Sequence, residues 1–424
     1  MSGGLLAACG GDDDPSGAAR DLKGTISYVK GPFSDDDLAI QKRLAENFQA
    51  EHPGVRIEPS LYAWESREAE LTTAFASQAP PDVSYQGDAI WVPFAAAGGL
   101  MDLSERVSSS DFADTFDAVP EHFWEAGKHE GKTYGVPVYV ASSCRLINLD
   151  LMDRAGVTDW SSSIEAMRSA ARQVKERTGE FGYASATAST DFNSYGQTMS
   201  YIFSAGGSVL SEDLSEATVD SPQVAAQFDE LRGMYIEDRA APKPGLYDSD
   251  GLNALWRRGR LAQLETFTNL VAAQTDPEQI DFEWQLEVTP PGPQGEPAVY
   301  GAVGMLFIAS RSKNAEAAWE YVRYLASRDT VLAYLEEYPD LGAARTDVPG
   351  TYVEGSPSGK AVYDFYNGQA VDVARGVPAY EKWPPVSRIL GEEYEQVLLG
   401  KKTGAEAAAA MGERTSSVLS GGSA

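Results

Sequence analysis

Residues 24–61, GTISYVKGPFSDDDLAIQKRLAENFQAEHPGVRIEPSL, decide the fold predicted for this chain. Thr25 to Val29 alternates between polar and apolar residues, as a half-buried strand does. Apolar residues then recur every four positions from 40 to 48, which is helical spacing, and His52-Pro53-Gly54 ends that helix. Residues 55–61 alternate again. The stretch therefore predicts a strand, a helix and a second strand.

The same order of elements continues downstream. Leu71 and Phe75 lie at helical spacing before Pro80-Pro81, and Asp82 to Tyr85 is a third strand. Trp91 to Ala97 predicts a further short helix. Strands that alternate with helices are joined by right-handed crossovers. We therefore expect an α/β fold with mainly parallel sheets and helices on both faces.

The length of the chain and its later elements indicate two lobes. A chain of 424 residues is long enough for two or three domains. A crossing between lobes is expected near Val138, and Pro290-Pro291-Gly292-Pro293 is typical of a linker that returns the chain to the first lobe. The predicted first lobe comprises residues 21–138 and 289–341, and the second comprises 139–288 and 342–424.

The charge of the chain restricts its partners. Acidic residues number 63 and basic residues 34, which gives a formal charge of −29. The resulting field repels phosphate backbones and anionic membrane surfaces, so no nucleic acid partner is expected and neutral or cationic ligands are favoured. Hydrophobic residues make up 43% of the chain, which excludes disorder.

The first residues resemble a bacterial lipobox. Leu5-Leu6-Ala7-Ala8-Cys9 precedes a tether rich in Gly and Asp, while a basic n-region and most of the h-region are missing. Residues 1–20 are therefore interpreted as a truncated lipoprotein signal and flexible tether. The resemblance implies that Cys9 carries lipid and anchors the chain at the extracellular face of the cytoplasmic membrane; a chance apolar N-terminus is the alternative. Cys144 is then left without a disulfide partner and is expected to be a buried, inert thiol.

The motifs of common metal and catalytic sites are incomplete. The three histidines lack an HExxH arrangement, and Gly131-Lys132-Thr133 lacks the first glycine of a phosphate-binding loop because position 126 is alanine. There is no GxSxG motif. No metal site and no cofactor are therefore expected.

Polar and aromatic residues follow the first three predicted strands. Ligands of open α/β sheets bind beyond the carboxyl ends of the strands, so these loops are expected to share one edge. Aromatic rings beside carboxylates and amides suit a sugar, whose C–H faces stack and whose hydroxyls need directional partners. The alternative is that the tryptophans are core residues and the aspartates are helix N-caps; the cap is favoured for Asp35 to Asp37 and the site for Asp88 and Trp91. The candidate residues are Asp36, Trp64, Gln86, Asp88 and Trp91.

Further motifs carry a resemblance that spans nearly the whole chain. They are Phe48 to Val55 (FQAEHPGV), Pro81-Asp82-Val83, Phe94 to Leu100 (FAAAGGL), Gly131 to Pro137 (GKTYGVP), Ser204 to Ser208 (SAGGS) and Lys313 to Trp319 (KNAEAAW). In this order and spacing, the chain resembles the extracellular solute-binding proteins of ATP-driven sugar importers, a family that includes maltose- and trehalose-binding lipoproteins. The resemblance implies a two-lobed periplasmic-binding-protein fold of type II that encloses its ligand by hinge closure.

The resemblance also implies further ligand-binding residues. Asp88 and Trp91 match the family's first-lobe sugar contacts, and Thr266 and Phe267 lie where members often place an aromatic residue. For Arg375, a surface ion pair is an equally weighted alternative. The other implied residues are Tyr139 at the lobe crossing, Asn193 and Tyr195 on a second-lobe wall, Gly301 near the hinge and Trp383 covering the sugar.

The predicted function is the capture of a neutral oligosaccharide, an α-linked disaccharide such as maltose or trehalose, and its delivery to a membrane permease. No chemistry is expected, and the protein is expected to be a monomer. The alternative is a secreted glycoside hydrolase that uses similar aromatic residues together with two catalytic carboxylates.

Overall fold

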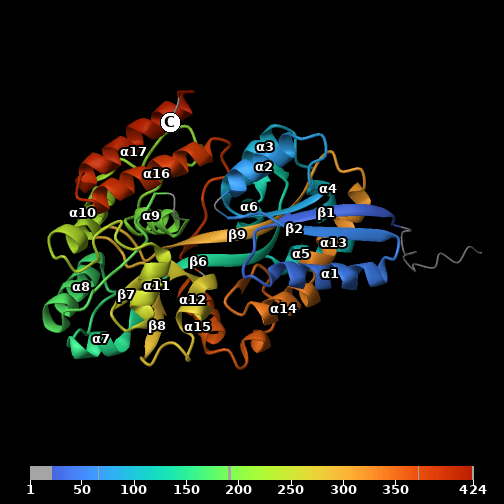
Figure 1. Cartoon of the computed structure of the whole chain (residues 1–424). Coiled ribbons are helices and arrows are strands. Elements are labelled where there is room, and N and C mark those ends of the chain that lie inside the picture. The colour runs from blue at the N-terminus through green and yellow to red at the C-terminus, as the bar shows by residue number, and fades with distance from the viewer. Residues whose placement is uncertain (1–21, 65, 190–191, 371, 423–424) are drawn as a thin grey trace, which may run out of the picture.

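The computed structural model describes residues 22–64, 66–189, 192–370 and 372–422. Figure 1 shows two lobes side by side, each built of helices packed around strands, with β6 (Val136–Asn148) and β9 (Val299–Ile308) passing between them. The predicted two-lobed α/β fold is confirmed. Residues 1–20, with Cys9, lie outside the described residues. No helix in the described ranges is long and apolar enough to cross a membrane.

The stretch that opens the first lobe folds as predicted. It forms β1 (Gly24–Lys30), α1 (Asp37–Glu51) and β2 (Val55–Leu61), and β1 pairs with β2 in parallel over its full length. The remaining elements of this lobe are α2 (Arg67–Ala76), β3 (Val83–Gln86), the 3₁₀ turn η1 (Asp88–Trp91), α3 (Val92–Ala96), α4 (Ser104–Val107), the 3₁₀ turn η2 (Ser110–Phe112), α5 (Ala113–Ala118), α6 (Glu121–Glu125), β4 (Lys128–His129), β5 (Lys132–Thr133), α13 (Ala315–Ala326), α14 (Arg328–Glu337) and β10 (Gly342–Ala343).

The second lobe is formed mainly by helices that surround a short antiparallel sheet. The last two helices of the chain, α16 and α17, pack against each other on the outer side of this lobe. Its elements are α7 (Leu149–Arg154), α8 (Ile164–Thr178), α9 (Phe192–Ser204), α10 (Pro222–Ile236), α11 (Ser249–Arg257), β7 (Gln263–Phe267), the 3₁₀ turn η3 (Thr268–Leu270), α12 (Val271–Gln274), β8 (Trp284–Glu287), α15 (Pro357–Phe365), the π-helical turn η5 (Tyr366–Ala370), β11 (Ala374–Arg375), α16 (Trp383–Leu398) and α17 (Gly404–Leu419).

The strand directions correct one detail of the predicted fold. The main sheet has the order β2-β1-β3-β9-β6-β10, and the pairs β1–β2 and β1–β3 are parallel as expected. However, β9 runs antiparallel to both β3 and β6. The expectation of mainly parallel sheets is therefore wrong beyond β3. The reason is that β9 enters from the second lobe, at the edge where β1 and β3 end, and must run in the opposite direction.

Strand β6 connects the two lobes without a break. Its residues Val136 to Ser142 pair with β9, and from Ser143 onward it pairs with β7 and β8 in the second lobe. The partner changes between Ser142 and Ser143, four residues beyond the crossing expected near Val138. Sequence periodicity does not mark this point, because the strand itself is continuous.

We propose that the other two lobe limits also lie later than expected. The linker at residues 290–293 packs on the second lobe, where the Gly292 amide donates to the Ser204 carbonyl at 2.9 Å. At the far end, β10 pairs with β6 in the main sheet, and Val348 is buried in the first-lobe core. We propose lobe limits at the partner change in β6, within β9 and after Val348.

A buried ion pair joins three elements of the first lobe. The Lys30 ammonium, at the end of β1, donates to the Asp37 carboxylate at the start of α1 and to the Tyr334 hydroxyl of α14, the latter at 2.7 Å. Lys30 and Asp37 are 1% and 0% exposed. Burial lowers the pKa of Lys30 to about 8, although the charge of Asp37 opposes this shift. Asp37 also accepts from the Phe33 amide at 2.7 Å, so the pair holds the loop between β1 and α1.

The structure corrects the role predicted for Asp36. This residue occupies the N-cap position of α1, but its exposed side chain makes no capping hydrogen bond. The neighbouring Asp37 holds the start of the helix instead, because its carboxylate has a buried cation as partner. Asp36 does not face a described pocket.

Replacing Lys30 by Met should leave the Asp37 carboxylate buried without its cation. We expect the free energy of unfolding to fall by about 3–5 kcal/mol. The double variant Lys30→Met/Asp37→Asn should recover most of this loss, because no uncompensated buried charge remains. Urea unfolding followed by tryptophan fluorescence measures both effects.

The control for this experiment is Arg43→Met. It breaks the Arg43–Glu337 pair, whose side chains are 52% and 42% exposed, and should cost less than about 1 kcal/mol. A similarly small loss for Lys30→Met, or no recovery in the double variant, would contradict the structural role of the buried pair.

Candidate functional site

The loops after β1, β2 and β3 share one edge of the sheet, as predicted. The Tyr62 hydroxyl donates to the Tyr85 carbonyl at 2.8 Å, and the Phe33 ring centroid lies 6.1 Å from that of Trp64. The Trp64 indole is half-buried and donates its N–H to the Pro32 carbonyl. An aromatic group therefore lines the carboxyl ends of these strands, with the polar atom of Trp64 already engaged.

Trp91 lies in the core in this conformation. Its side chain is 0% exposed, and its ring centroid lies 5.2 Å from Phe307 and 6.0 Å from Tyr134. The indole therefore has no free face for stacking on a ligand. This corrects the sequence-based prediction, which favoured a ligand-binding role for Trp91 over a role in the core. The strand-end argument located the loop, but it could not show that this side chain points back into the lobe.

The other candidates of the first half of the chain are also largely enclosed. Gln86 is 1% exposed and donates its amide to the Ser84 hydroxyl at 2.8 Å. Tyr139 is 7% exposed and packs with its centroid 4.7 Å from Tyr334, inside the first lobe. The side chains of Asp88 and Asn193 lie outside the described residues.

Two candidates far apart in the sequence meet on the second lobe. The Trp383 indole N–H, at the start of α16, donates to the Tyr195 hydroxyl of α9 at 2.9 Å. The Tyr195 ring stands edge-on to Tyr300 of β9 with centroids 5.4 Å apart, and Phe267 lies behind Tyr300 at 6.1 Å. Tyr195, Phe267 and Trp383 therefore form one aromatic wall, with Tyr300 at its centre.

The remaining candidates lie around the same strand. Gly301 follows Tyr300 and is buried, and a Cβ atom there would lie 3.3 Å from the Cβ of Ala374. Arg375 pairs in β11 beside Tyr300; its side chain is exposed and forms no ion pair within the described part of the chain. Thr266 is buried and accepts from the Gln274 amide at 2.8 Å, which explains its burial without a ligand.

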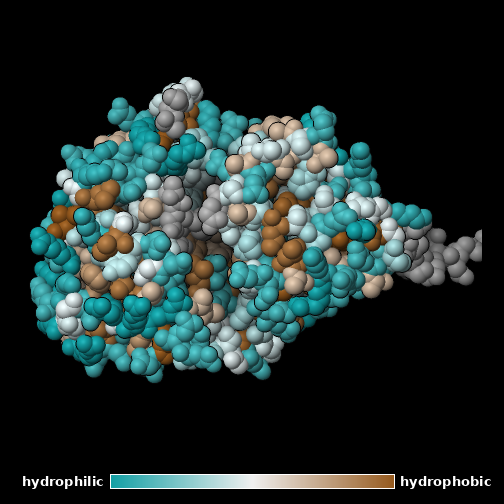
Figure 2. All heavy atoms as spheres, viewed as in Figure 1, coloured by the Kyte–Doolittle hydropathy of each residue, from teal (hydrophilic) through white to brown (hydrophobic). Residues whose placement is uncertain are grey.

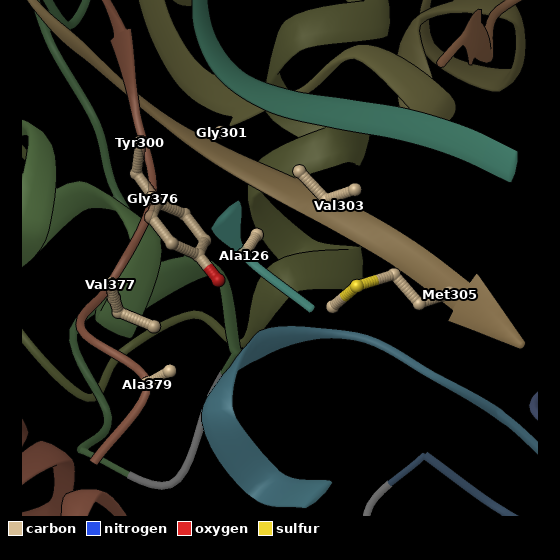
Figure 3. Close-up of a pocket in the computed structure, with 8 residues that line it drawn as sticks. All are labelled: Ala126, Tyr300, Gly301, Val303, Met305, Gly376, Val377 and Ala379. Carbon is tan, nitrogen blue, oxygen red and sulfur yellow. The ribbon is translucent and has the colours of Figure 1, made fainter. Parts of the chain in front are cut away.

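A small cavity lies where the two lobes meet (Figure 3). First-lobe residues, second-lobe residues and the crossing strand β9 all contribute to it. Its volume is about 20 Å³, which accommodates about one water molecule. The lining residues are Ala126, Tyr300, Gly301, Val303, Met305, Gly376, Val377 and Ala379.

Sequence reasoning found one edge of this cavity and missed most of it. Gly301 was predicted, whereas the flanking Tyr300, Val303 and Met305 read as ordinary strand residues. Val377 lies beside the predicted Arg375 but carries no chemical signal of its own. Ala126 follows α6, and only the folded chain brings it opposite Tyr300.

The space between the lobes is narrow in this conformation. Figure 2 shows a recess between two largely hydrophilic lobes. Below it, one continuous hydrophobic cluster includes Trp91 and Phe307 of the first lobe together with Phe267 and Trp383 of the second. Sites for small molecules usually measure about 300–1,000 Å³. As it stands, the cavity is therefore smaller than a usual site for a small molecule.

A wider groove of about 520 Å³ lies within the second lobe, between β8 and α15. Its lining includes Trp284, Gln285, Asp364 and Gln369, none of which was predicted to bind a ligand. Since this groove does not lie between the lobes, its shape is independent of hinge closure. We therefore take the interlobe cavity as the candidate site.

A buried polar network lies two residues from Phe267. The Glu265 carboxylate accepts from the Tyr201 hydroxyl, which lies 3.0 Å from the Tyr183 hydroxyl. Burial raises the pKa of Glu265 to about 7, and both the charge of Arg145 and the Tyr201 hydrogen bond oppose that shift. The thiol of Cys144 is buried as predicted, and burial raises its pKa as well.

Two α/β lobes, two strands that pass between them and a cavity at their boundary define a two-lobed solute-binding architecture. The sequence agrees with this class. A family model described as bacterial extracellular solute-binding protein matches residues 30–331, and the chain belongs to that family.

Similar proteins include curated relatives and solved structures. A putative binding protein of Brucella abortus is 21% identical over 389 residues, which cover 91% of this chain and 89% of that protein. The diacetylchitobiose binding protein DasA of Streptomyces coelicolor is 25% identical over 181 residues, or 41% of this chain and 40% of DasA. The cyclic alpha-maltosyl-1,6-maltose binding protein of Arthrobacter globiformis superposes with a TM-score of 0.78 at 21% identity, covering 94% of this chain and 100% of that structure.

The raised pKa of Glu265 predicts a pH-dependent stability. Because its pKa is about 7 in the folded chain and ordinarily 4.5, the folded chain binds more protons between these values. The free energy of unfolding should therefore fall as the pH rises from 4.5 to 7, by roughly 3 kcal/mol at most. Glu265→Gln should remove this part of the dependence, as measured by urea unfolding at pH 5 and pH 8.

The matched control is Glu381→Gln, which changes an exposed carboxyl group and should leave the pH dependence unchanged. An equal difference between pH 5 and pH 8 in the wild type and in Glu265→Gln would show that Glu265 does not titrate in this range.

Proposed function

We propose that this protein is the substrate-binding component of an ABC sugar transporter. It captures a neutral oligosaccharide by hinge closure and delivers it to a membrane permease. The observation that carries the proposal is the cavity between the lobes, flanked by the aromatic wall of Tyr195, Phe267 and Trp383. The ligand-binding residues proposed for the separated lobes are this wall with Gly301 and Arg375, faced by Trp64 and Gln86 of the first lobe.

The chemistry of the cavity supports a neutral ligand. None of its lining side chains carries a charge, and the aromatic rings around it can pack against the C–H faces of a sugar. Opening the lobes would uncover part of the hydrophobic cluster that joins them, and a bound sugar would replace the lost contacts. Binding would therefore favour the closed arrangement of the lobes.

The finer part of the proposal is an α-linked disaccharide such as maltose or trehalose. The name of the Arthrobacter globiformis protein, which has the same fold, supports an α-linked sugar. The name of the Streptomyces coelicolor relative refers instead to diacetylchitobiose. Ligands of both kinds therefore belong in the first binding experiment.

We further propose that the chain works as a monomer, anchored through lipid on Cys9 at the extracellular face of the cytoplasmic membrane, without a nucleic acid partner. The membership of an extracellular family supports this location. The charge of −29 would keep the solvated lobes away from anionic lipid while the tether holds them near the permease.

We propose that the protein performs no catalysis. A glycoside hydrolase needs two carboxylates on either side of the scissile bond, and no carboxylate lines the described cavity. Incubation with maltose, trehalose and longer oligosaccharides should release no reducing sugar. Sustained release would instead favour the hydrolase.

A thermal-shift screen over mono-, di- and oligosaccharides, polyols and amino acids tests the proposed ligand class. At a hundred times its dissociation constant, a ligand of the native state adds about 2.7 kcal/mol of stability, or roughly 3 °C in melting temperature for a chain of this size. We expect this shift with an α-linked disaccharide and none with amino acids. A shift with amino acids alone would contradict the proposal.

Arg375→Ala tests the site by calorimetry with the sugar found in that screen. Because the Arg375 side chain is exposed and its mutation removes no described ion pair, we expect weaker binding, by tenfold or more, at an unchanged melting temperature. Arg258→Ala, also exposed and at the end of α11, is the control and should bind as the wild type does. Unchanged binding in both variants would remove Arg375 from the site.

A further inference from the structure

The cavity between the lobes is more apolar than a site for sugar hydroxyls alone requires. Apart from two glycines, its lining consists of the apolar side chains of Ala126, Val303, Met305, Val377 and Ala379, and of one tyrosine. A sugar hydroxyl placed there would lose its hydration and find at most one side-chain partner. A methyl group would fill the same space without that loss.

The one polar side chain in the cavity is Tyr300. Its ring is 0% exposed, and its hydroxyl has no hydrogen-bond partner within the described part of the chain. Figure 3 shows this hydroxyl at the end of the ring that faces Ala126. A buried phenol without a partner is costly, and a ligand acceptor would relieve that cost.

The position of the Tyr300 hydroxyl is fixed by contacts of both its backbone and its ring. The backbone amide of Tyr300 donates to the hydroxyls of Ser143 and Ser200, at 3.1 and 2.9 Å. Its ring stands edge-on to Tyr195 and Phe267. The hydroxyl is therefore a preorganised donor, held beside an apolar space about the size of one methyl group.

We propose that this cavity receives the acetamido group of an N-acetylated sugar. The methyl group would lie among Val303, Met305 and Val377, and the amide carbonyl would accept from the Tyr300 hydroxyl. A plain hydroxyl placed there would lose its hydration without filling the apolar space, whereas a 6-deoxy methyl group would fill the space and leave Tyr300 without a partner. The inference deepens the proposed sugar-binding function, on which it rests, and concerns a ring substituent rather than the linkage between rings.

Matched pairs of ligands test the inference by isothermal titration calorimetry on the full chain. N,N′-diacetylchitobiose is compared with cellobiose, and the methyl α-glycoside of N-acetylglucosamine with that of glucose; within each pair only the substituent at C2 differs. We expect the acetamido member to bind at least tenfold more tightly in at least one pair. Equal binding within both pairs, or a preference only for 6-deoxyglucose over glucose, would overturn the inference while leaving sugar binding intact.

Two variants separate the contributions of the cavity. Tyr300→Phe should weaken binding of the acetamido sugar about tenfold and leave the matched hydroxyl sugar unchanged, because only the hydrogen bond to the carbonyl is lost. Val377→Thr, which places a hydroxyl in the apolar part, should also reduce the preference. Val288→Thr makes the same change at a half-buried site outside the cavity and is the control.

The outcomes distinguish the two proposals. If no sugar binds the wild type, the proposed function and the inference both fail. If sugars bind and Tyr300→Phe, folded as judged by its melting temperature, weakens both members of a pair equally, Tyr300 contacts the ligand without selecting the acetamido group, and the inference fails alone.

Discussion

The pairing of β6 with β9 is the constraint on which the rest of the structure depends. Both strands belong to the main sheet of the first lobe, and β6 continues without a break into the sheet of the second. Backbone hydrogen bonds therefore connect the two lobes. At the crossing, Gly301 of β9 faces Ser142 of β6, and the change of partner follows one residue later.

This constraint also positions the candidate site. Because β9 crosses the boundary, its residues from Tyr300 to Met305 line the base of the space between the lobes, and β11 places Arg375 beside them. The wall formed by Tyr195 and Trp383 rests on the same strand through Tyr300. Hinge bending would therefore move the walls of the site while its base remains in place.

The two lobes differ in how polar groups support this base. In the first, the buried pair of Lys30 and Asp37 holds the loop after β1, at the edge where the aromatic residues gather. In the second, Glu265 and Tyr201 join β7 to α9 behind the aromatic wall. Both networks are buried and largely satisfied within the protein, so they favour a single arrangement of each lobe.

The sequence by itself determined the α/β elements of the first lobe, because apolar spacing follows directly from the geometry of a strand or helix, as in residues 24–61. It also predicted that the loops after the first three strands share one edge of the sheet, and it singled out Gly301, which lines the cavity. Only the tertiary structure decided the direction of β9, the burial of Trp91 and the place of Tyr300 in the cavity. These depend on contacts between residues hundreds of positions apart, and local periodicity carries no record of such contacts.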